Sequence, residues 1–162
     1  LIIIALYMVW ASKEEMDGHY PKNEAWIKRL GEKSLANYQQ YGVDPKEKLG
    51  TDNPLEIGRM IRKWVVEYMT SGPVVKGVVS GVHAIDMVRK ICGNSLPNLA
   101  DMGTIRGDFS VDSAVSANLN KRATRNIIHA SENKQEVENE MKLWFKEKEI
   151  HNYKRAEEDI MF

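Results

Sequence analysis

Cysteine, charge of one sign and long apolar runs are all scarce in this sequence. Its one cysteine, Cys92, cannot form an intramolecular disulfide, so we expect a reducing, cytoplasmic environment. Lysine plus arginine and aspartate plus glutamate each number 23, so a large electrostatic surface for nucleic acid is not expected. The apolar run at residues 1–10 is only about half as long as a bilayer span and lacks the basic start of a signal peptide. We therefore expect no membrane association.

Several sequence motifs of nucleotide and metal chemistry are also missing. The chain has no GxxxxGK[ST] phosphate loop, no GxGxxG motif and no GxSxG nucleophile turn. It has neither a CxxC nor an HExxH metal-binding pair. Any bound phosphate must therefore be held by side chains rather than by a glycine-rich backbone loop.

What is present is the pattern of one globular domain. The 162 residues are 43% hydrophobic and 28% charged, enough for a core of their own. Apolar and β-branched runs predict strands, the first of them buried, at residues 1–10, 74–79 and 127–129. Caps and apolar stripes predict helices at residues 12–18, 23–40, 53–70, 82–92 and 133–144. With loops at 42–51 and 94–123, this alternation indicates an α+β or α/β class in which helices cover one sheet.

The stretch Arg125–Glu132 places His129 at the end of a short apolar run. Such a histidine is often a satisfied core residue, and the alternative is a nucleophile or a base. Glu140, on the following helix, could hold one ring nitrogen and leave the other free, or it could be a solvated helix charge. Ser131 is a candidate N-cap of that helix, close to any anion bound beside His129. Asn133, followed three residues later by a glutamate, is a second candidate cap.

Two arginines offer planar guanidinium groups that match phosphate oxygens. Arg106 stands in the glycine-containing stretch Gly103–Phe109, where the backbone can approach a ligand closely. Arg89 lies beside the apolar stripe of its helix. The small basic cluster at 121–125 is interpreted as a solvated loop rather than a nucleic-acid surface.

The stretches Gly103–Phe109 and Arg125–Ser131 resemble the motifs of nucleoside diphosphate kinases. Further similar segments lie at residues 68–75, 88–97 and 138–145. The resemblance is close over residues 68–145 and loose over residues 5–20. The chain looks like the long archaeal members, which carry inserts corresponding to residues 22–55 and 112–124.

This resemblance implies a ferredoxin-like βαββαβ domain, an antiparallel sheet covered by helices with helical insertions, at residues 1–145. A charged tail follows at residues 146–162. It implies a homohexamer or homotetramer. It also implies ping-pong transfer of the γ-phosphoryl group of a nucleoside triphosphate, usually ATP, to a nucleoside diphosphate. Mg²⁺ would be carried by the nucleotide rather than by a protein site.

Matched residue by residue, the resemblance makes His129 the histidine that carries the phosphoryl group. The residues that match its supporting partners are Tyr20, Ser131 and Glu140. Those that match the nucleotide and phosphate binders are Arg89, Ser95 (where threonine is usual), Arg106 and Asn126.

The chain departs from the family pattern near its beginning. The family's first strand leads through Lys-Pro-Asp and a helix into the second strand, whereas here Ile4 is followed directly by Ala5. A crossover alone takes about a dozen residues, so the comparison implies that roughly twenty residues, with a phosphate-contacting lysine, are absent there. Met102 stands where the family has a proline, and the base-stacking phenylalanine is not identifiable, with Trp26 and Trp64 as candidate substitutes. The gap after Ile4 supports an alternative function, a catalytically impaired oligomeric scaffold or nucleotide-binding member of the same fold.

Overall fold

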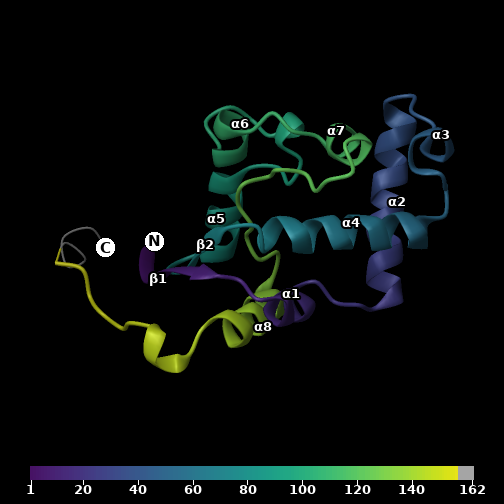
Figure 1. Ribbon diagram of the computed structural model, residues 1–162. Helices are drawn as coiled ribbons and strands as arrows, with labels where there is room; N and C mark the ends of the chain where they lie inside the picture. Colours follow the sequence, from purple (N-terminus) through teal and green to yellow (C-terminus); the bar gives the residue numbers. More distant parts are fainter. Residues whose placement is uncertain (157–162) are drawn as a thin grey trace.

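A short antiparallel sheet lies at one side of the molecule, with α5 above it and α1 and α8 below it in the view of Figure 1. The computed structural model describes residues 1–156. The two strands are β1 (Ile2–Trp10) and β2 (Pro73–Ser80). The helices are α1 (Lys13–His19), α2 (Glu24–Gln40), α3 (Pro45–Leu49), α4 (Pro54–Met69), α5 (Ala84–Cys92), α6 (Ile105–Phe109), α7 (Ala114–Leu119) and α8 (Lys134–Trp144), with 3-10 turns at Pro97–Leu99 and Glu147–Glu149. Within the described part of the chain, no helix combines the length and apolarity needed to cross a membrane.

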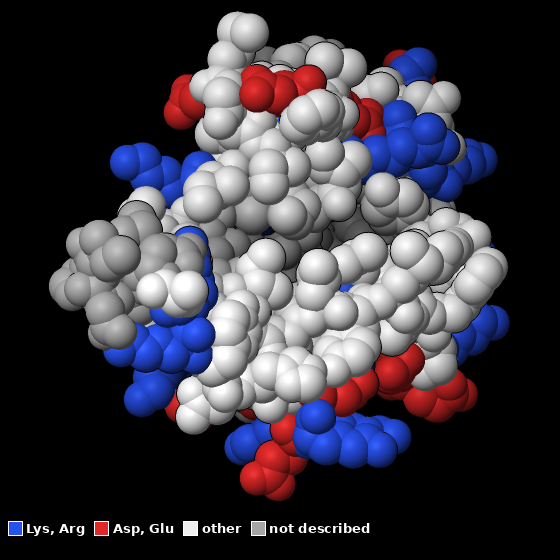
Figure 2. Space-filling model, turned by 90° about the vertical axis from the view of Figure 1, so that its left-hand side faces the viewer, with Lys and Arg blue, Asp and Glu red and all other residues white. Residues whose placement is uncertain are grey.

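The prediction that residues 1–10 are buried is wrong for one face of β1. Leu6, Met8 and Trp10 are 60%, 73% and 67% exposed, whereas Ala5 is 3% exposed. An unbroken apolar run has no alternation from which a half-exposed strand could be recognised. Figure 2 shows the side of the molecule at which the sheet lies, where a broad uncharged surface is bordered by charged side chains.

The register of β1 changes at Ile4. Ile3 pairs with Val79 and Ala5 pairs with Val78, so Ile4 is an extra residue in the ladder. A bulge of this kind leaves one residue unpaired and reverses the alternation of side chains beyond it. The bulge lies at the Ile4–Ala5 junction, where the family pattern implies that residues are absent. The absence of those residues stays a prediction.

Helices α1 and α8 pack closely because of a glycine. Ser12 and Glu15 form the expected capping box at the start of α1. A Cβ atom on Gly18 would lie 2.9 Å from Cδ1 of Leu143, so a larger residue there would require the Leu143 side chain to shift. The contact brings His19, at the end of α1, against α8.

Helices α2 and α4 cross at two glycines. A Cβ atom on Gly31 would lie 1.8 Å from the carbonyl oxygen of Pro54, and one on Gly58 would lie 2.0 Å from that of Ile27. The backbones therefore touch directly. Asn53 caps α4 and Pro54 occupies its first turn, as the sequence predicts.

The two inserted segments, residues 22–55 and 112–124, pack against each other. Helix α7 lies on α2, where the Asn118 side-chain amide donates a buried hydrogen bond of 2.7 Å to the Ser34 hydroxyl. The expectation of a loop at 42–51 is wrong, because that segment contains α3, and the loop-rich region at 94–123 carries the short helices α6 and α7. The helix α3 has a local cause: Asp44 caps it and Gly50, with φ 81°, ends it.

The predicted strand at residues 127–129 does not form. Ile127 has a φ of 56°, which no extended strand can contain. The carbonyls of Asn126 and Ile128 are taken by the Arg106 side chain instead of a strand partner. The α+β class is nevertheless confirmed, and residues 1–156 contain two of the strands of the implied βαββαβ order.

The tail lies along β1. The backbone N–H of His151 donates to the carbonyl of Ile4 (2.8 Å), and the Tyr153 hydroxyl donates to that of Ile3 (2.9 Å). Lys76 of β2 donates to the carbonyl of Trp144, which fastens the end of α8 to the sheet. The part of the predicted charged tail at residues 157–162 lies outside the described residues.

Candidate active site

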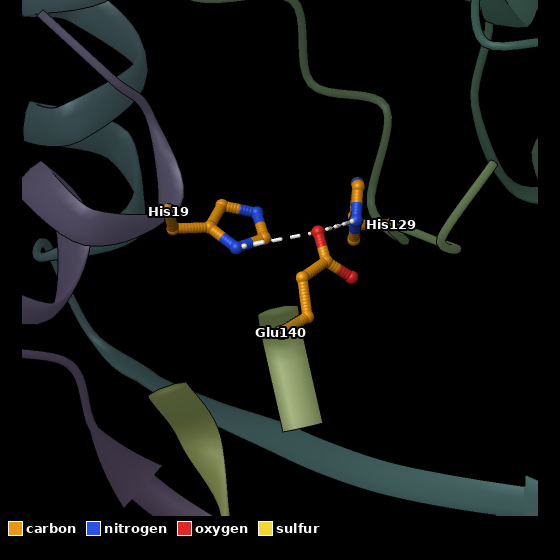
Figure 3. Close-up of side chains that lie close together, drawn as sticks. All are labelled: His19, His129 and Glu140. Atoms are coloured by element: carbon orange, nitrogen blue, oxygen red, sulfur yellow. Dashed lines mark hydrogen bonds and ion pairs between the residues drawn. The ribbon is translucent and has the colours of Figure 1, made fainter. Parts of the chain in front are cut away.

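His129 and Glu140 form the centre of the site (Figure 3). The Nε2 atom of His129 lies 2.8 Å from Oε1 of Glu140. Burial raises the pKa of Glu140, but hydrogen bonds from His129 and Ser131 outweigh it and the pKa lies below its usual value. An ionised carboxylate only accepts hydrogen bonds, so Nε2 carries the ring proton and Nδ1 keeps its lone pair. With its side chain 44% exposed, His129 presents a nucleophilic nitrogen to solvent.

Ser131 holds the other carboxylate oxygen. Its hydroxyl donates to Oε2 of Glu140 at 2.6 Å. Of the two candidate caps, Ser131 is wrong, because Asn133 caps α8 by accepting from the backbone N–H of Glu136. Asn133 is one residue from the first turn, whereas Ser131 is too far back along the chain. Ser131 instead fixes the carboxylate that orients His129.

His19 is a second histidine at the same carboxylate (Figure 3). Its Nδ1 atom lies 3.5 Å from Oε1 of Glu140, and its ring meets that of His129 edge-on with 4.8 Å between centroids. Burial, with the neighbouring His129 second, lowers the pKa of His19 to about 4 against the opposing effect of Glu140. His19 is therefore neutral at pH 7 and makes no ion pair with Glu140.

Trp144 fixes the tautomer of His19. Its indole Nε1 lies 3.1 Å from Nδ1 of His19. An indole N–H can only donate, so Nδ1 of His19 is the acceptor and its Nε2 carries the proton. Sequence reasoning about single residues missed His19. The available signal was the i, i+4 spacing of Glu140 and Trp144, which places both side chains on one face of α8.

Tyr20 lies beside His19 and is largely enclosed. The two rings are 4.6 Å apart in a T-shaped contact, and burial raises the pKa of Tyr20 to about 12. Arg62 of α4 donates to the Tyr20 carbonyl at 2.9 Å and pairs with Asp17 at 2.7 Å. Helix α4 thereby connects to the wall of the site.

Arg106 supports the loop that carries His129. It is 6% exposed, and its guanidinium donates to the carbonyls of Gly93 (2.6 Å), Asn126 (3.3 Å) and Ile128 (2.6 Å). A guanidinium has five N–H donors, so two remain after these three bonds. The geometry therefore gives Arg106 a structural role beside any role in binding a ligand. This residue also holds the backbone on both sides of the strained Ile127.

The other candidate phosphate binders are Arg89, Ser95 and Asn126. Arg89, with its side chain 43% exposed, approaches Glu132 at 3.9 Å, a weak pair that a more highly charged anion can displace. Ser95 is exposed and Asn126 is half-buried. The Arg89 guanidinium and the Ser95 side chain are therefore accessible from solvent.

Comparison with known proteins decides the family. The model of the nucleoside diphosphate kinase family matches residues 57–150. A nucleoside diphosphate kinase of Pyrobaculum aerophilum is 47% identical over 150 residues, which are 93% of this chain and 82% of that protein. The chain belongs to the nucleoside diphosphate kinase family. Members of this family are phosphotransferases, and the resemblance carried by Gly103–Phe109 and Arg125–Ser131 is confirmed.

Solved nucleoside diphosphate kinases share the fold. A crystal structure from Pyrobaculum aerophilum has a TM-score of 0.87 and 46% identity, covering 93% of this chain and 83% of that one. A kinase from Borrelia burgdorferi, described as a transition-state mimic with bound vanadate and ADP, has a TM-score of 0.76 and 30% identity. That similarity covers 97% of this chain and 77% of the Borrelia chain. The family fold is therefore present along nearly the whole chain.

Proposed function

We propose that this chain transfers the γ-phosphoryl group of a nucleoside triphosphate, usually ATP, to a nucleoside diphosphate through phosphohistidine at His129. One observation carries the proposal: the Glu140 carboxylate holds the Nε2–H of His129 at 2.8 Å and leaves Nδ1 of this 44% exposed side chain with its lone pair. A neutral imidazole oriented in this way is a nucleophile at pH 7.

The first half-reaction follows from this arrangement. The lone pair of His129 Nδ1 attacks the γ-phosphorus, and the bond from that phosphorus to the bridging oxygen breaks. The nucleoside diphosphate leaves with the electron pair of that bond. Glu140 stabilises the positive charge that develops on the imidazole, because it already accepts the Nε2 proton. The second half-reaction is the reverse, with a different nucleoside diphosphate as acceptor.

We propose that the phosphate groups are held by Arg89, Ser95, Asn126 and the two remaining donors of Arg106. A loose, in-line transfer spreads charge over the phosphoryl oxygens, and guanidinium groups stabilise that charge. The ADP and vanadate in the Borrelia relative support such a transfer. The donor set is cationic and neutral, so it fits a Mg²⁺ ion held by the nucleotide's own phosphate oxygens rather than by a protein cage. When bound, that ion neutralises phosphate charge.

We further propose a homohexamer or homotetramer in a reducing, cytoplasmic environment. The exposed apolar face of β1 supports subunit contact, because a large uncovered apolar surface is typical of an interface. The buried free thiol of Cys92 supports the reducing environment. Nucleic acid is a weaker candidate partner, because Arg122 of the basic cluster already forms a two-fold ion pair with Asp112.

The alternative is a non-catalytic nucleotide-binding scaffold of the same fold. Its support is the direct Ile4–Ala5 junction, where β1 carries its bulge and the expected lysine is absent. Measurement of the intact mass separates the two proposals. A mass about twenty residues above 18.5 kDa restores the lysine-bearing segment, whereas 18.5 kDa favours the scaffold.

The proposed activity is tested by incubation with γ-labelled ATP and Mg²⁺. We expect label in an acid-labile, base-stable linkage, as befits a phosphohistidine, and no label in His129→Asn. His83→Asn is the matched control, because His83 is exposed and lies before α5. Label that persists in His129→Asn would contradict the assignment of the nucleophile.

A further inference from the structure

The cluster of His19, His129 and Glu140 brings together three metal-ligating groups whose ligand atoms all lie within 4.8 Å of one another. Two imidazoles and one carboxylate form a donor set typical of protein zinc sites with an open coordination position. We propose that these three residues bind Zn²⁺ and that zinc binding switches off phosphoryl transfer. The inhibitory part of this proposal rests on the proposed role of His129, whereas the binding part does not.

Two of the three distances between ligand atoms are already close to those of a tetrahedral ion, and all three are within 4.8 Å. Ligand atoms about 2.0–2.2 Å from zinc in tetrahedral geometry lie about 3.3 Å from one another. The Nδ1 atom of His19 is 3.5 Å from Oε1 of Glu140, which already agrees. The Nε2 atom of His129 is 2.8 Å from the same oxygen and must move away by about half an ångström to admit the ion.

The protonation states favour binding at His19. Zinc needs a nitrogen lone pair, and Nδ1 of His19 has one because it accepts the Trp144 hydrogen bond at 3.1 Å. That hydrogen bond is also the main competitor, because zinc and the indole N–H would use the same lone pair. Removing the indole donor should therefore strengthen zinc binding.

The surroundings supply the other features of a metal site. The Ser131 hydroxyl holds Oε2 of Glu140 at 2.6 Å, and such a hydrogen bond orients a ligating carboxylate. The His129 side chain is 44% exposed, which gives an ion a path from solvent. Mg²⁺ is not a competitor here, because it demands octahedral oxygen ligands and this cluster offers two nitrogens.

Inhibition follows from the tautomer of His129. A neutral imidazole has one proton and one lone pair, and in the resting site the proton is on Nε2 and the lone pair on Nδ1. Zinc bound at Nε2 takes that nitrogen's electron pair, so the proton moves to Nδ1. The atom that would attack phosphorus then has no free lone pair. Zinc therefore blocks the nucleophile without covering the phosphate side of the site.

The test measures zinc binding to the nucleotide-free protein by competition with a chromogenic chelator. We expect one zinc per chain and a loss of about 10- to 100-fold or more in affinity for His19→Asn. Trp144→Phe should bind zinc more tightly than the wild type, a gain that misfolding cannot imitate. His83→Asn, which removes an exposed histidine outside the cluster, should bind as the wild type does.

Unchanged affinity in His19→Asn, or no gain in Trp144→Phe, would overturn the assigned ligands. Phosphoenzyme formation from Mg·ATP is then compared with and without one equivalent of zinc. The wild-type rate should fall with zinc, whereas the ratio of the two rates in His19→Asn should stay near one. Tight zinc binding without any phosphoenzyme would reject the proposed function while leaving the metal site intact. Phosphoenzyme formation at the same rate in zinc-loaded protein would reject the inhibitory role.

Discussion

Ile127 has a φ of 56°, two residues before the proposed nucleophile. A β-branched residue in this region costs about 1–2 kcal/mol, and such strain persists only where the surroundings hold it. Arg106 provides that hold by binding the carbonyls of Asn126 and Ile128. The strained turn, rather than a strand, therefore sets the position of His129.

This account predicts the effect of glycine at residue 127. Glycine adopts positive φ freely, so Ile127→Gly loses the contacts of the isoleucine side chain but relieves the strain. We expect it to cost about 1–2 kcal/mol less in the free energy of unfolding than Ile128→Gly, the matched control without positive φ. Urea denaturation of both variants measures the difference. Equal losses would show that residue 127 stores no strain.

His19 predicts how stability depends on pH. Its pKa in the folded protein is about 4, because of burial, and below the value near 6.5 of an exposed histidine. The unfolded chain therefore binds a proton between pH 6.5 and 4 that the folded chain does not. Stability should fall as the pH drops through this window, by up to about 1.4 kcal/mol per pH unit and about 3 kcal/mol in all.

Urea denaturation at pH 7.0 and 4.5, in the presence of a chelator, measures this contribution. The loss of stability on acidification should be smaller in His19→Gln than in the wild type, and unchanged in the exposed control His83→Gln. The contribution of the Glu140 carboxylate to stability is lost at lower pH, because it disappears only as the pH falls through the depressed pKa of Glu140. An equal acid loss in His19→Gln would contradict a neutral, buried His19.

At the scale of elements, the α2–α4 crossing depends on Gly31. A Cβ atom there would lie 1.8 Å from the Pro54 carbonyl oxygen, so Gly31→Ala must separate the helices. We expect a loss of at least about 2 kcal/mol in the free energy of unfolding. Gly72→Ala is the control, because its Cβ would meet no atom within 4 Å. Thermal and urea denaturation should separate the two variants, and similar stabilities would mean that the crossing adapts easily.

Helices could be predicted from the sequence wherever the residues that cause them lie within a few positions of one another. The cap at Asn53 with Pro54, the Ser12–Glu15 capping box and the apolar stripe of α4 all act within a few residues. The missing strand at residues 127–129 was not predictable, because its cause is the side chain of Arg106 from another segment. The position of His19 was not predictable for the same reason, because its partner Trp144 on α8 lies 125 positions away in the sequence. The hydrogen bond between His129 and Glu140, in contrast, is one of the two alternatives that the sequence left open for Glu140.

At the scale of the whole molecule, one face of the sheet exposes large apolar side chains, on a side of the molecule with a broad uncharged surface (Figure 2). Met8 stands opposite Val75 across the two strands, and they are 73% and 61% exposed. If subunits meet there, Met8→Lys should lower the molar mass in light scattering after gel filtration, because an interface cannot bury an unpaired charge cheaply.

The control for the interface is Val82→Lys, which charges another residue that is 82% exposed but precedes α5. It should keep the wild-type molar mass. An unchanged mass in Met8→Lys would place the subunit contacts elsewhere on the molecule. The exposed apolar face would then need a different explanation.

The central claim is that His129 carries a phosphoryl group from one nucleotide to another, and transfer from the isolated phosphoenzyme tests it most directly. The protein is labelled with γ-labelled ATP, freed of nucleotide and mixed with GDP and Mg²⁺. We predict that label leaves the protein and is recovered in GTP, one equivalent for each phosphorylated chain. Label that stays on the protein, or that is released only as inorganic phosphate, would contradict the account.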